Sequence, residues 1–188
     1  MTDPSGALRG LSPDQTLVLV NGTRRHASAL VNVNGTVGRG SAAVDLNAIP
    51  SGALDRVEVL RDGASAQYGS DAIAGVVNLR LKEAREGGGA SVTYGQYFTN
   101  VETARGKRDE QDGRAVTVSA WQGFGLGSDG FLTLSAEYSD RDPTNRSDYD
   151  PRPAANGAIT ARFGDPKVEQ WSVFANAGKP LNADWEAY

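Results

Sequence analysis

The sequence predicts a mainly β protein in two parts: a partial α+β unit, followed by the first four to five antiparallel strands of a β-barrel. Three observations support this fold class. Up to about Leu81, short apolar runs and turn residues follow one another without a repeat. Three consecutive glycines stand at positions 87–89, where neither a helix nor a strand is expected to be stable. Beyond them, polar and apolar residues alternate strictly in four longer segments, as in strands with one apolar face.

A hairpin begins the first unit. Thr16 to Val20 is a run of leucine and β-branched residues, and the dipeptide Asn21-Gly22 follows it directly. This dipeptide favours a type I′ turn, because both of its residues accept positive φ. A return strand is therefore expected through Thr23 and Arg25.

Two further strands and two helical turns are predicted in the rest of this unit. Pro50 is expected to begin a helical turn through Leu54. Residues 56–60 alternate charged and apolar side chains as a half-buried strand does, and residues 76–81 form another strand. Between them we expect a short strand at 66–68. A helical turn over 69–75 follows, with Ser70 as its N-cap.

The connections between the later strands alternate in length, and this alternation indicates a membrane barrel. Gln96 to Gly113 is long and charged, Gly125 to Gly130 is tight, Arg141 to Asp165 is very long, and Lys179 to Asp184 is short again. Outer-membrane barrels have long loops at one rim, short turns at the other, and apolar side chains outside. In the segment 132–139 the apolar residues occupy the even positions and the polar residues the odd ones. A soluble β-rich binding or adhesion domain is the rival interpretation, which this alternation disfavours.

The composition excludes several classes of function. The 188 residues include no cysteine and one histidine, so disulfides, thiol nucleophiles and multi-histidine metal sites are not expected. No nucleophile, base and orienting group stand at a recognisable spacing, which argues against an enzyme. A net charge of −4 disfavours a nucleic-acid partner, since phosphate binding needs an excess of Lys and Arg. The sequence predicts no metal and no cofactor.

Two stretches of the first half resemble the TonB-dependent outer-membrane receptors. They are PDQTLVLVNGTRR (Pro13 to Arg25) and DLNAIPSGALDRVEVLRDGASAQYGSDAIAGVVNLRLK (Asp45 to Lys82), which resemble the later half of the plug domain of that family. The resemblance is specific in this half and generic in the strands that follow. It assigns residues 1–86 to the plug and residues 87–188 to the first strands of the transmembrane barrel.

This resemblance implies active uptake of a nutrient complex, such as a ferric siderophore, across the outer membrane of a bacterial cell. In the family, TonB supplies the energy through a segment at the start of the plug, and that segment is absent here. Most of the 22 expected strands are absent too, and no secretory signal is recognisable. We therefore expect an internal piece of a receptor that does not transport alone. Its expected partners are TonB, the nutrient ligand and outer-membrane lipid. Iron chelates, cobalamin, nickel chelates and oligosaccharides all remain open as ligands.

The resemblance also places candidate ligand contacts at the apex of the plug. The loop 27–40 is too long for a hairpin turn and is rich in Asn and Gly, as binding loops often are. A flexible loop without a binding role is the alternative. The candidate ligand-binding residues are Arg25, His26, Asn32, Asn34 and Arg39.

A second candidate set lies in the predicted strand RVEVL and the turn after it. Alternation alone would make these charges a solvated strand edge, whereas the family resemblance indicates that they seat the plug against the barrel wall. The candidate plug–barrel interface residues are Arg56, Glu58, Arg61 and Asp62.

Two further motifs have simpler explanations. The glycines at 125, 127 and 130 satisfy a dinucleotide-binding pattern, but they stand between two alternating strands and favour a tight turn. Calcium binds carboxylate oxygens, which four aspartates could supply, but these residues lack the spacing of an EF-hand. They are Asp140, Asp142, Asp148 and Asp150. A solvated loop is the favoured interpretation of these four carboxylates.

Overall fold

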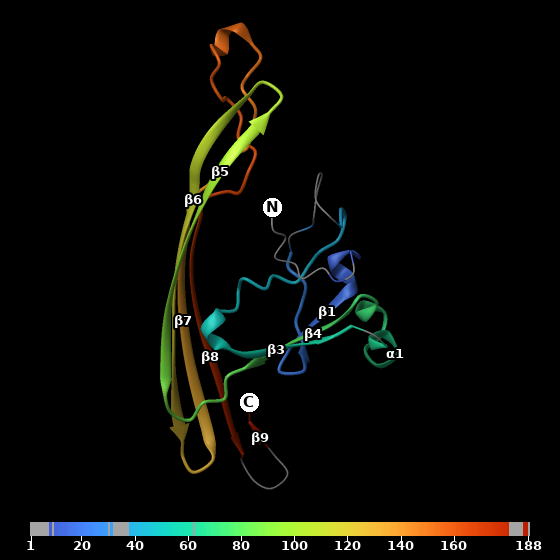
Figure 1. Ribbon diagram of the computed structural model, residues 1–188. Coiled ribbons are helices and arrows are strands. Elements are labelled where there is room, and N and C mark those ends of the chain that lie inside the picture. Colours follow the sequence, from blue (N-terminus) through green and yellow to red (C-terminus); the bar gives the residue numbers. More distant parts are fainter. Residues whose placement is uncertain are drawn as a thin grey trace.

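Two β-sheets make up the protein, as the computed structural model shows for residues 8, 10–29, 31, 38–61, 63–180 and 186–187 (Figure 1). A small sheet has four strands in the order β2-β1-β4-β3, and a large sheet has five strands in the order β5-β6-β7-β8-β9. In Figure 1 the long strands curve around the side on which the small sheet lies. The predicted mainly β fold is confirmed.

The small sheet contains short strands joined by helical turns. Strands β1 and β4 pair in parallel at its centre, while β2 and β3 pair antiparallel at its two edges. Its elements in chain order are η1 (Pro13–Gln15), β1 (Thr16–Val20), β2 (Thr23–Arg24), η2 (Ser51–Ala53), β3 (Leu54–Leu60), α1 (Ala64–Tyr68), η3 (Ser70–Ala72) and β4 (Gly75–Leu81).

Most predictions for this unit are confirmed. Asn21 has φ 48° and Gly22 has φ 82°, as the predicted hairpin turn requires. The short strand predicted at 66–68 is wrong, because these residues belong to α1. Glycines in positive φ stand on both sides of α1, at 63 and 69, and they separate it from the strands. The expected helical turn is present as η3, but Ser70 is its first residue and not its N-cap, which is Gly69.

The core of the protein lies on the two faces of the small sheet. Central strands buried on both faces account for the unbroken apolar run of β1. One face packs against residues 44–53, and the other packs against the turns around Ala72. The first cluster consists of Val18, Val44, Ile49, Ala53, Val77, Leu79 and Leu81, and the second of Leu17, Leu19, Ala72 and Val76.

The large sheet is an antiparallel meander, in which each strand pairs with the next. Its strands are β5 (Gly88–Thr103), β6 (Gly106–Leu126), β7 (Gly130–Arg141), β8 (Val168–Pro180) and β9 (Glu186–Ala187). The turn 127–129 and the end of β8 lie at one end of the sheet, and the segment 142–167 lies at the other (Figure 1). Residues 181–184 of the predicted short connection lie outside the described residues.

The long charged connection predicted over Gln96 to Gly113 is wrong. Both β5 and β6 continue through it to a two-residue turn, Ala104–Arg105, so that the pair forms a long hairpin. Polar residues pair across this hairpin, including Glu102 with Lys107 at 2.7 Å. The charged residues therefore form an exposed hairpin and not a loop, since cross-strand pairs of opposite charge stabilise a solvated strand pair.

Of the three glycines at 87–89, only Gly87 lies between the two units, because β5 begins at Gly88. Gly88 and Gly89 already belong to β5, where Gly89 pairs with Trp121. A Cβ atom on Gly89 would lie 2.8 Å from the indole nitrogen of Trp121. The large indole therefore requires a residue without a side chain opposite it, which accounts for a glycine inside a strand.

The two faces of the large sheet have opposite character. On the outer face, away from the small sheet, Val92 is 72% exposed and Val173 is 79% exposed. On the inner face Ser119, Thr133 and Ser135 are buried. This distribution is the reverse of that in a water-soluble sheet, where the apolar face is covered. Among the described residues, no helix combines the length and apolar character needed to cross a membrane.

Leu79→Ala should destabilise the small sheet by about 2–5 kcal/mol, because it leaves a cavity in the first core cluster. Val57→Ala is the matched control, since Val57 pairs with Leu79 across β3 and β4 but is about half exposed. We expect the control to cost less than about 1 kcal/mol. Denaturant unfolding of the two variants measures both values, and equal losses would contradict this description of the core.

Candidate functional site

The small sheet is attached to the inner face of the large sheet through a segment that precedes β3. The side-chain amide of Gln170 donates to the carbonyl oxygen of Asn47 at 2.8 Å. The backbone N–H of Ser51 donates to Glu137 Oε2 at 3.0 Å, and the Ser51 hydroxyl donates to the same oxygen. At Gly52 the two sheets are so close that a Cβ atom would lie 2.6 Å from Ser119 Oγ.

A second set of contacts lies where the chain passes from β4 to β5. Asn176 donates to the carbonyl oxygen of Lys82 at 3.0 Å, and the N–H of Ala84 donates to Thr133 Oγ1 at 3.0 Å. The Lys82 ammonium lies 5.4 Å from the centre of the Trp121 ring, a favourable distance for a cation–π contact. Polar groups of the inner face thus satisfy the backbone of this connecting segment.

Two of the residues predicted to seat the plug, Arg56 and Glu58, lie on β3 and make their hydrogen bonds and ion pairs within the small sheet. Arg56 pairs with Asp55 and with Glu58, and Glu58 also accepts from the Asn78 amide at 2.8 Å. The Asn78 amide, followed by Arg56, lowers the pKa of Glu58. Arg61 is exposed, and Asp62 lies outside the described residues. Their proposed interface role stays a prediction.

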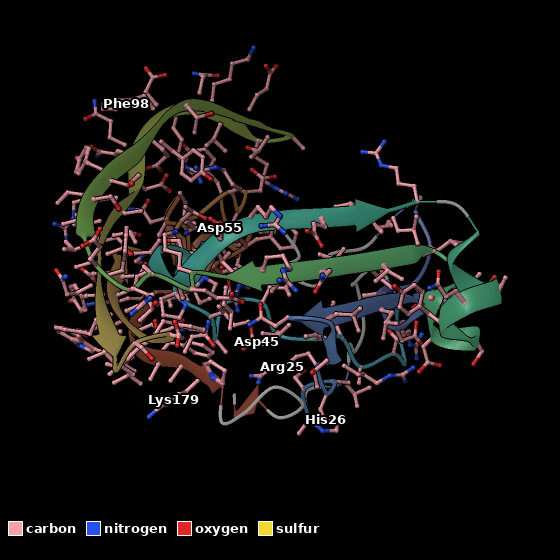
Figure 2. All side chains as sticks on the ribbon, turned by 90° about the horizontal axis from the view of Figure 1, so that it is seen from below. Arg25, His26, Asp45, Asp55, Phe98 and Lys179 are labelled. Atoms are coloured by element: carbon pink, nitrogen blue, oxygen red, sulfur yellow. The ribbon has the colours of Figure 1, made fainter. Side chains whose placement is uncertain are left out.

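Two of the predicted apical ligand residues lie beside the opposite edge of the small sheet. Arg25 and His26 follow β2 and are exposed, as Figure 2 shows on the side of the sheet away from β3. Arg39 lies in the turn 38–40, and an antiparallel bridge between Val31 and Ala42 brings the two arms of this loop together. Asn32 and Asn34 lie outside the described residues. A ligand role for the five residues stays a prediction.

Sequence reasoning missed an ordered structure formed by the segment 142–167. The two arms of this segment pair through their backbones, and the N–H of Arg146 donates to the carbonyl oxygen of Phe163 at 2.7 Å. Asp112 on β6 binds the Arg146 guanidinium through both carboxylate oxygens, at 2.6 and 2.8 Å. Arg108, also on β6, donates to the carbonyl oxygen of Ser147 at 2.8 Å. The long hairpin and this segment are therefore held together as one unit.

The Asp112–Arg146 pair lies beyond the part of β6 that pairs with β7, which begins at Ala115. The guanidinium of Arg146 lowers the pKa of Asp112, and a backbone hydrogen bond from Asn145 contributes to the same shift. Because the pKa is lowered, the contribution of this pair is complete above the ordinary pKa of an aspartate. It is lost only as the pH falls through the lowered value.

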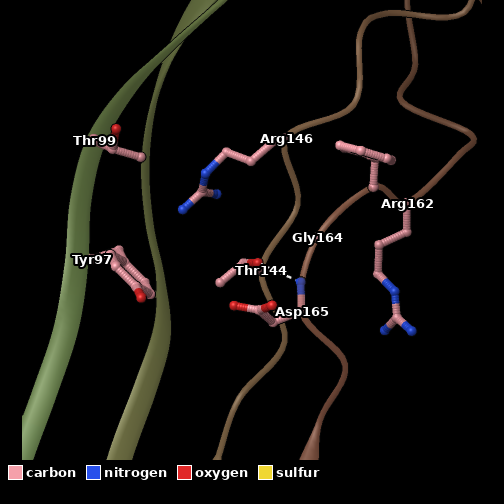
Figure 3. Close-up of a pocket in the computed structure, with 8 residues that line it drawn as sticks. Tyr97, Thr99, Thr144, Arg146, Arg162, Gly164 and Asp165 are labelled. Carbon is pink, nitrogen blue, oxygen red and sulfur yellow. Dashed lines mark hydrogen bonds between the residues drawn. The ribbon is translucent and has the colours of Figure 1, made fainter. Parts of the chain in front are cut away.

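A pocket of about 430 Å³ lies between the hairpin and the segment 142–167 (Figure 3). Figure 3 shows the Arg146 side chain directed toward β5, while that of Arg162 is directed away from the hairpin. The Tyr97 ring lies 5.9 Å from the Arg146 guanidinium. The pocket combines aromatic rings with cationic groups, and it is lined by Tyr97, Thr99, Thr144, Arg146, Arg162, Phe163, Gly164 and Asp165.

The four aspartates considered as calcium ligands each pair with an arginine. Asp140 and Asp142 both contact Arg114, Asp148 contacts Arg105, and Asp150 contacts Arg152. Over the described ranges, no group of three His, Cys, Asp or Glu side chains is arranged to hold a metal ion. The sequence did contain a signal for this network, because arginines are interspersed with the aspartates. It did not indicate which charges pair.

The sequence matches several proteins of known family. Residues 2–76 match the family described as TonB-dependent Receptor Plug Domain. The vitamin B12 transporter BtuB of Vibrio cholerae is 31% identical over 182 residues, which cover 90% of this chain and 25% of the transporter. The ferric enterobactin receptor PirA of Pseudomonas aeruginosa is 37% identical over 94 residues, which cover 50% of this chain and 12% of that receptor.

A solved structure shares the fold. The ferric enterobactin receptor PfeA of Pseudomonas aeruginosa, in a mutant form, superposes with a TM-score of 0.64 at 23% identity. The superposition covers 93% of this chain and 24% of that receptor chain. The chain thus spans about a quarter or less of the length of these relatives.

Asp112→Ala should release the segment 142–167 from the hairpin, because Arg146 would lose its charged partner. A hydrogen bond to a charged group contributes about 1.5–3 kcal/mol, so backbone amide exchange over 143–150 should accelerate on the order of tenfold or more. Asp109→Ala is the control on the same hairpin, since Asp109 is exposed and accepts a hydrogen bond from Asn100. Hydrogen exchange measured by mass spectrometry compares the two variants. Equal exchange in both would contradict the proposal that the Asp112–Arg146 pair holds the segment to the hairpin.

Proposed function

This chain belongs to the TonB-dependent receptors, and we propose that the receptor it forms part of takes up a scarce nutrient complex across the bacterial outer membrane. One observation carries the proposal. A small sheet matching the plug domain of this family is held on the polar inner face of a sheet whose outer face is apolar and exposed. A transmembrane barrel that encloses a plug requires this polarity. No covalent chemistry is assigned to the chain.

Residues 1–86 form the later part of the plug in this proposal, and residues 87–188 form the first strands of the barrel. The continuous polar contacts of residues 82–87 with the inner face support a boundary in this region. In this proposal TonB supplies the energy for uptake through the plug. Arg56, Glu58, Arg61 and Asp62 remain candidates for contacts with other parts of the barrel.

The proposed ligand is a ferric siderophore or a similar nutrient complex. One relative is named as a ferric enterobactin receptor and another as a vitamin B12 transporter, which fits this ligand class. Arg25, His26, Asn32, Asn34 and Arg39 are the proposed plug contacts. The pocket beside Tyr97 and Phe163 adds cationic and aromatic groups from the long hairpin and the segment 142–167, which are suited to an anionic aromatic ligand.

A transport assay tests the function directly. The complete receptor is produced in a bacterial host without its own receptors, and accumulation of labelled ferric siderophore and labelled cobalamin is measured. We expect one ligand to accumulate, and only in a host that contains TonB. Equal accumulation with and without TonB, or no accumulation of any nutrient complex across a wider panel, would contradict the proposal.

The same assay tests the apical residues. Arg25→Ala and Arg39→Ala should each raise the half-saturating concentration of an anionic ligand on the order of tenfold, as for the loss of one charge-assisted contact. Lys167→Ala is the matched control, since Lys167 is an exposed cation outside the proposed ligand contacts. An equal effect of all three variants would contradict the assignment of Arg25 and Arg39 as ligand contacts.

Val173→Arg tests whether the outer face contacts lipid. In water an arginine at this exposed position should leave the free energy of unfolding almost unchanged. Near the centre of a bilayer it should lower the stability by about 2–4 kcal/mol. Phe98→Arg is the control, because Phe98 is also exposed but lies on the hairpin beyond the strands that pair with β7. Unfolding of the receptor in lipid bilayers should show a loss for Val173→Arg alone. Unchanged stability of that variant would place the outer face in water.

A further inference from the structure

The two attachments of the small sheet to the inner face differ in kind. Residues 82–87 lead directly into β5, so they stay close to the large sheet whatever the small sheet does. The contacts of residues 47–53 are not held in this way, since Ser51 and Glu137 are 86 positions apart in the chain. Movement of the small sheet away from the wall therefore requires these contacts to break, whereas the chain connection at 82–87 can persist.

Glu137 makes the strongest polar contact in the first attachment. One of its carboxylate oxygens accepts both the backbone N–H and the hydroxyl of Ser51, and hydrogen bonds to an ionised acceptor are stronger than those between neutral groups. Ser51 is well placed to transmit this restraint. The neighbouring Pro50 and Ala53 are buried, and Ala53 belongs to the first core cluster.

The surroundings of this contact allow it to open. A cavity of about 450 Å³ adjoins it and is lined by both apolar and polar side chains, the polar ones including Glu137, Ser139 and Gln170. Ser51 itself is exposed, so water can replace its bonds to the carboxylate when the turn moves away. Close packing at Gly52 adds little polar attraction, because the buried Ser119 hydroxyl has no hydrogen-bond partner.

The attachment at 82–87 is built to stay closed. Thr133 is 2% exposed and exchanges hydrogen bonds with both backbone groups of Ala84. The carbonyl oxygen of Gly87 accepts from the backbone N–H of Gly123 at 2.9 Å, which continues the sheet. Breaking these bonds would leave buried polar groups unsatisfied, at about 1–3 kcal/mol each.

We propose that Glu137 is the positioning residue that latches the plug to the barrel wall through Ser51, and that residues 82–87 are the hinge about which the released plug moves. This inference rests on the proposed function in one respect: uptake requires the plug to leave the position in which it closes the barrel. A ligand or TonB would shift this equilibrium only by favouring the released state over the latched one.

Hydrogen exchange in the complete receptor, without ligand or TonB, tests the latch. We expect Glu137→Ala to accelerate exchange of the Ser51 amide on the order of tenfold, with peptide 82–87 unchanged. Glu137→Gln keeps an acceptor oxygen without the charge, so exchange should be intermediate. Glu169→Ala is the matched control, because Glu169 lies on the outer face of the neighbouring strand β8, and it should leave Ser51 as in the wild type.

Two results would overturn the proposal. One is wild-type exchange at Ser51 in Glu137→Ala, and the other is equal acceleration at Ser51 and in peptide 82–87, which would indicate general loosening. Thermal unfolding of each variant shows whether the fold is intact. Because neither measurement involves transport, failure of the latch and failure of the uptake proposal are distinguishable.

Discussion

The reversed polarity of the large sheet is the constraint on which the rest of the structure depends. Polar side chains face inward, so the sheet cannot bury them against an apolar core without leaving hydrogen-bonding groups unsatisfied. The small sheet resolves this by presenting backbone groups of residues 47–53 and 82–84 to the inner face. Most apolar packing lies on the two faces of the small sheet, and Phe174 of β8 also packs against its first cluster. The hydrogen bonds that join the two sheets are few and specific.

Polar contacts of this kind suit a part that must stay in place and also move. An apolar interface gains free energy in proportion to the area it removes from water, and its separation exposes that area again. A hydrogen bond between protein groups is exchanged for hydrogen bonds to water at a smaller net cost. The attachment at Glu137 is of the second type, and the adjoining cavity gives water access to it.

Much of the fold was predictable from periodicity. The period-two pattern of residues 132–139 identified both faces of β7, and the Asn21-Gly22 dipeptide identified the hairpin between β1 and β2. The errors arose where context determined conformation. Residues 66–68 adopt a helix because flanking glycines in positive φ isolate them. The charged residues of 96–113 form strands because several of them find partners across the hairpin or on the segment 142–167, such as Glu102 with Lys107 and Asp112 with Arg146.

The candidate site was less predictable than the fold. Asp112 and Arg146 are 34 positions apart, and Ser51 and Glu137 are 86 apart, so no local pattern indicates either pair. Glu137 occupies one of the polar positions of β7, and the alternation of the sequence does not distinguish it from the serines and threonine at the other polar positions. The residue types in the loop also did not show that its aspartates pair with arginines. Pairing of this kind follows from the register of strands that the sequence alone leaves open.

The meander also bears on how the two sheets are able to form. Each long strand pairs with its neighbour in the chain, so the large sheet can grow by adding strands in sequence, and the β5–β6 and β6–β7 hairpins have only short loops to close. The small sheet is different, since β1 pairs in parallel with β4 through Thr16 and Gly75, and more than fifty residues must be gathered before that pairing exists. Non-local pairing of this kind is slow, because the entropy of closing the intervening chain is lost before contacts compensate for it. Folding of the plug is thus expected to lag behind pairing of the adjacent wall strands, which would offer a partly assembled polar surface on which the plug can complete itself.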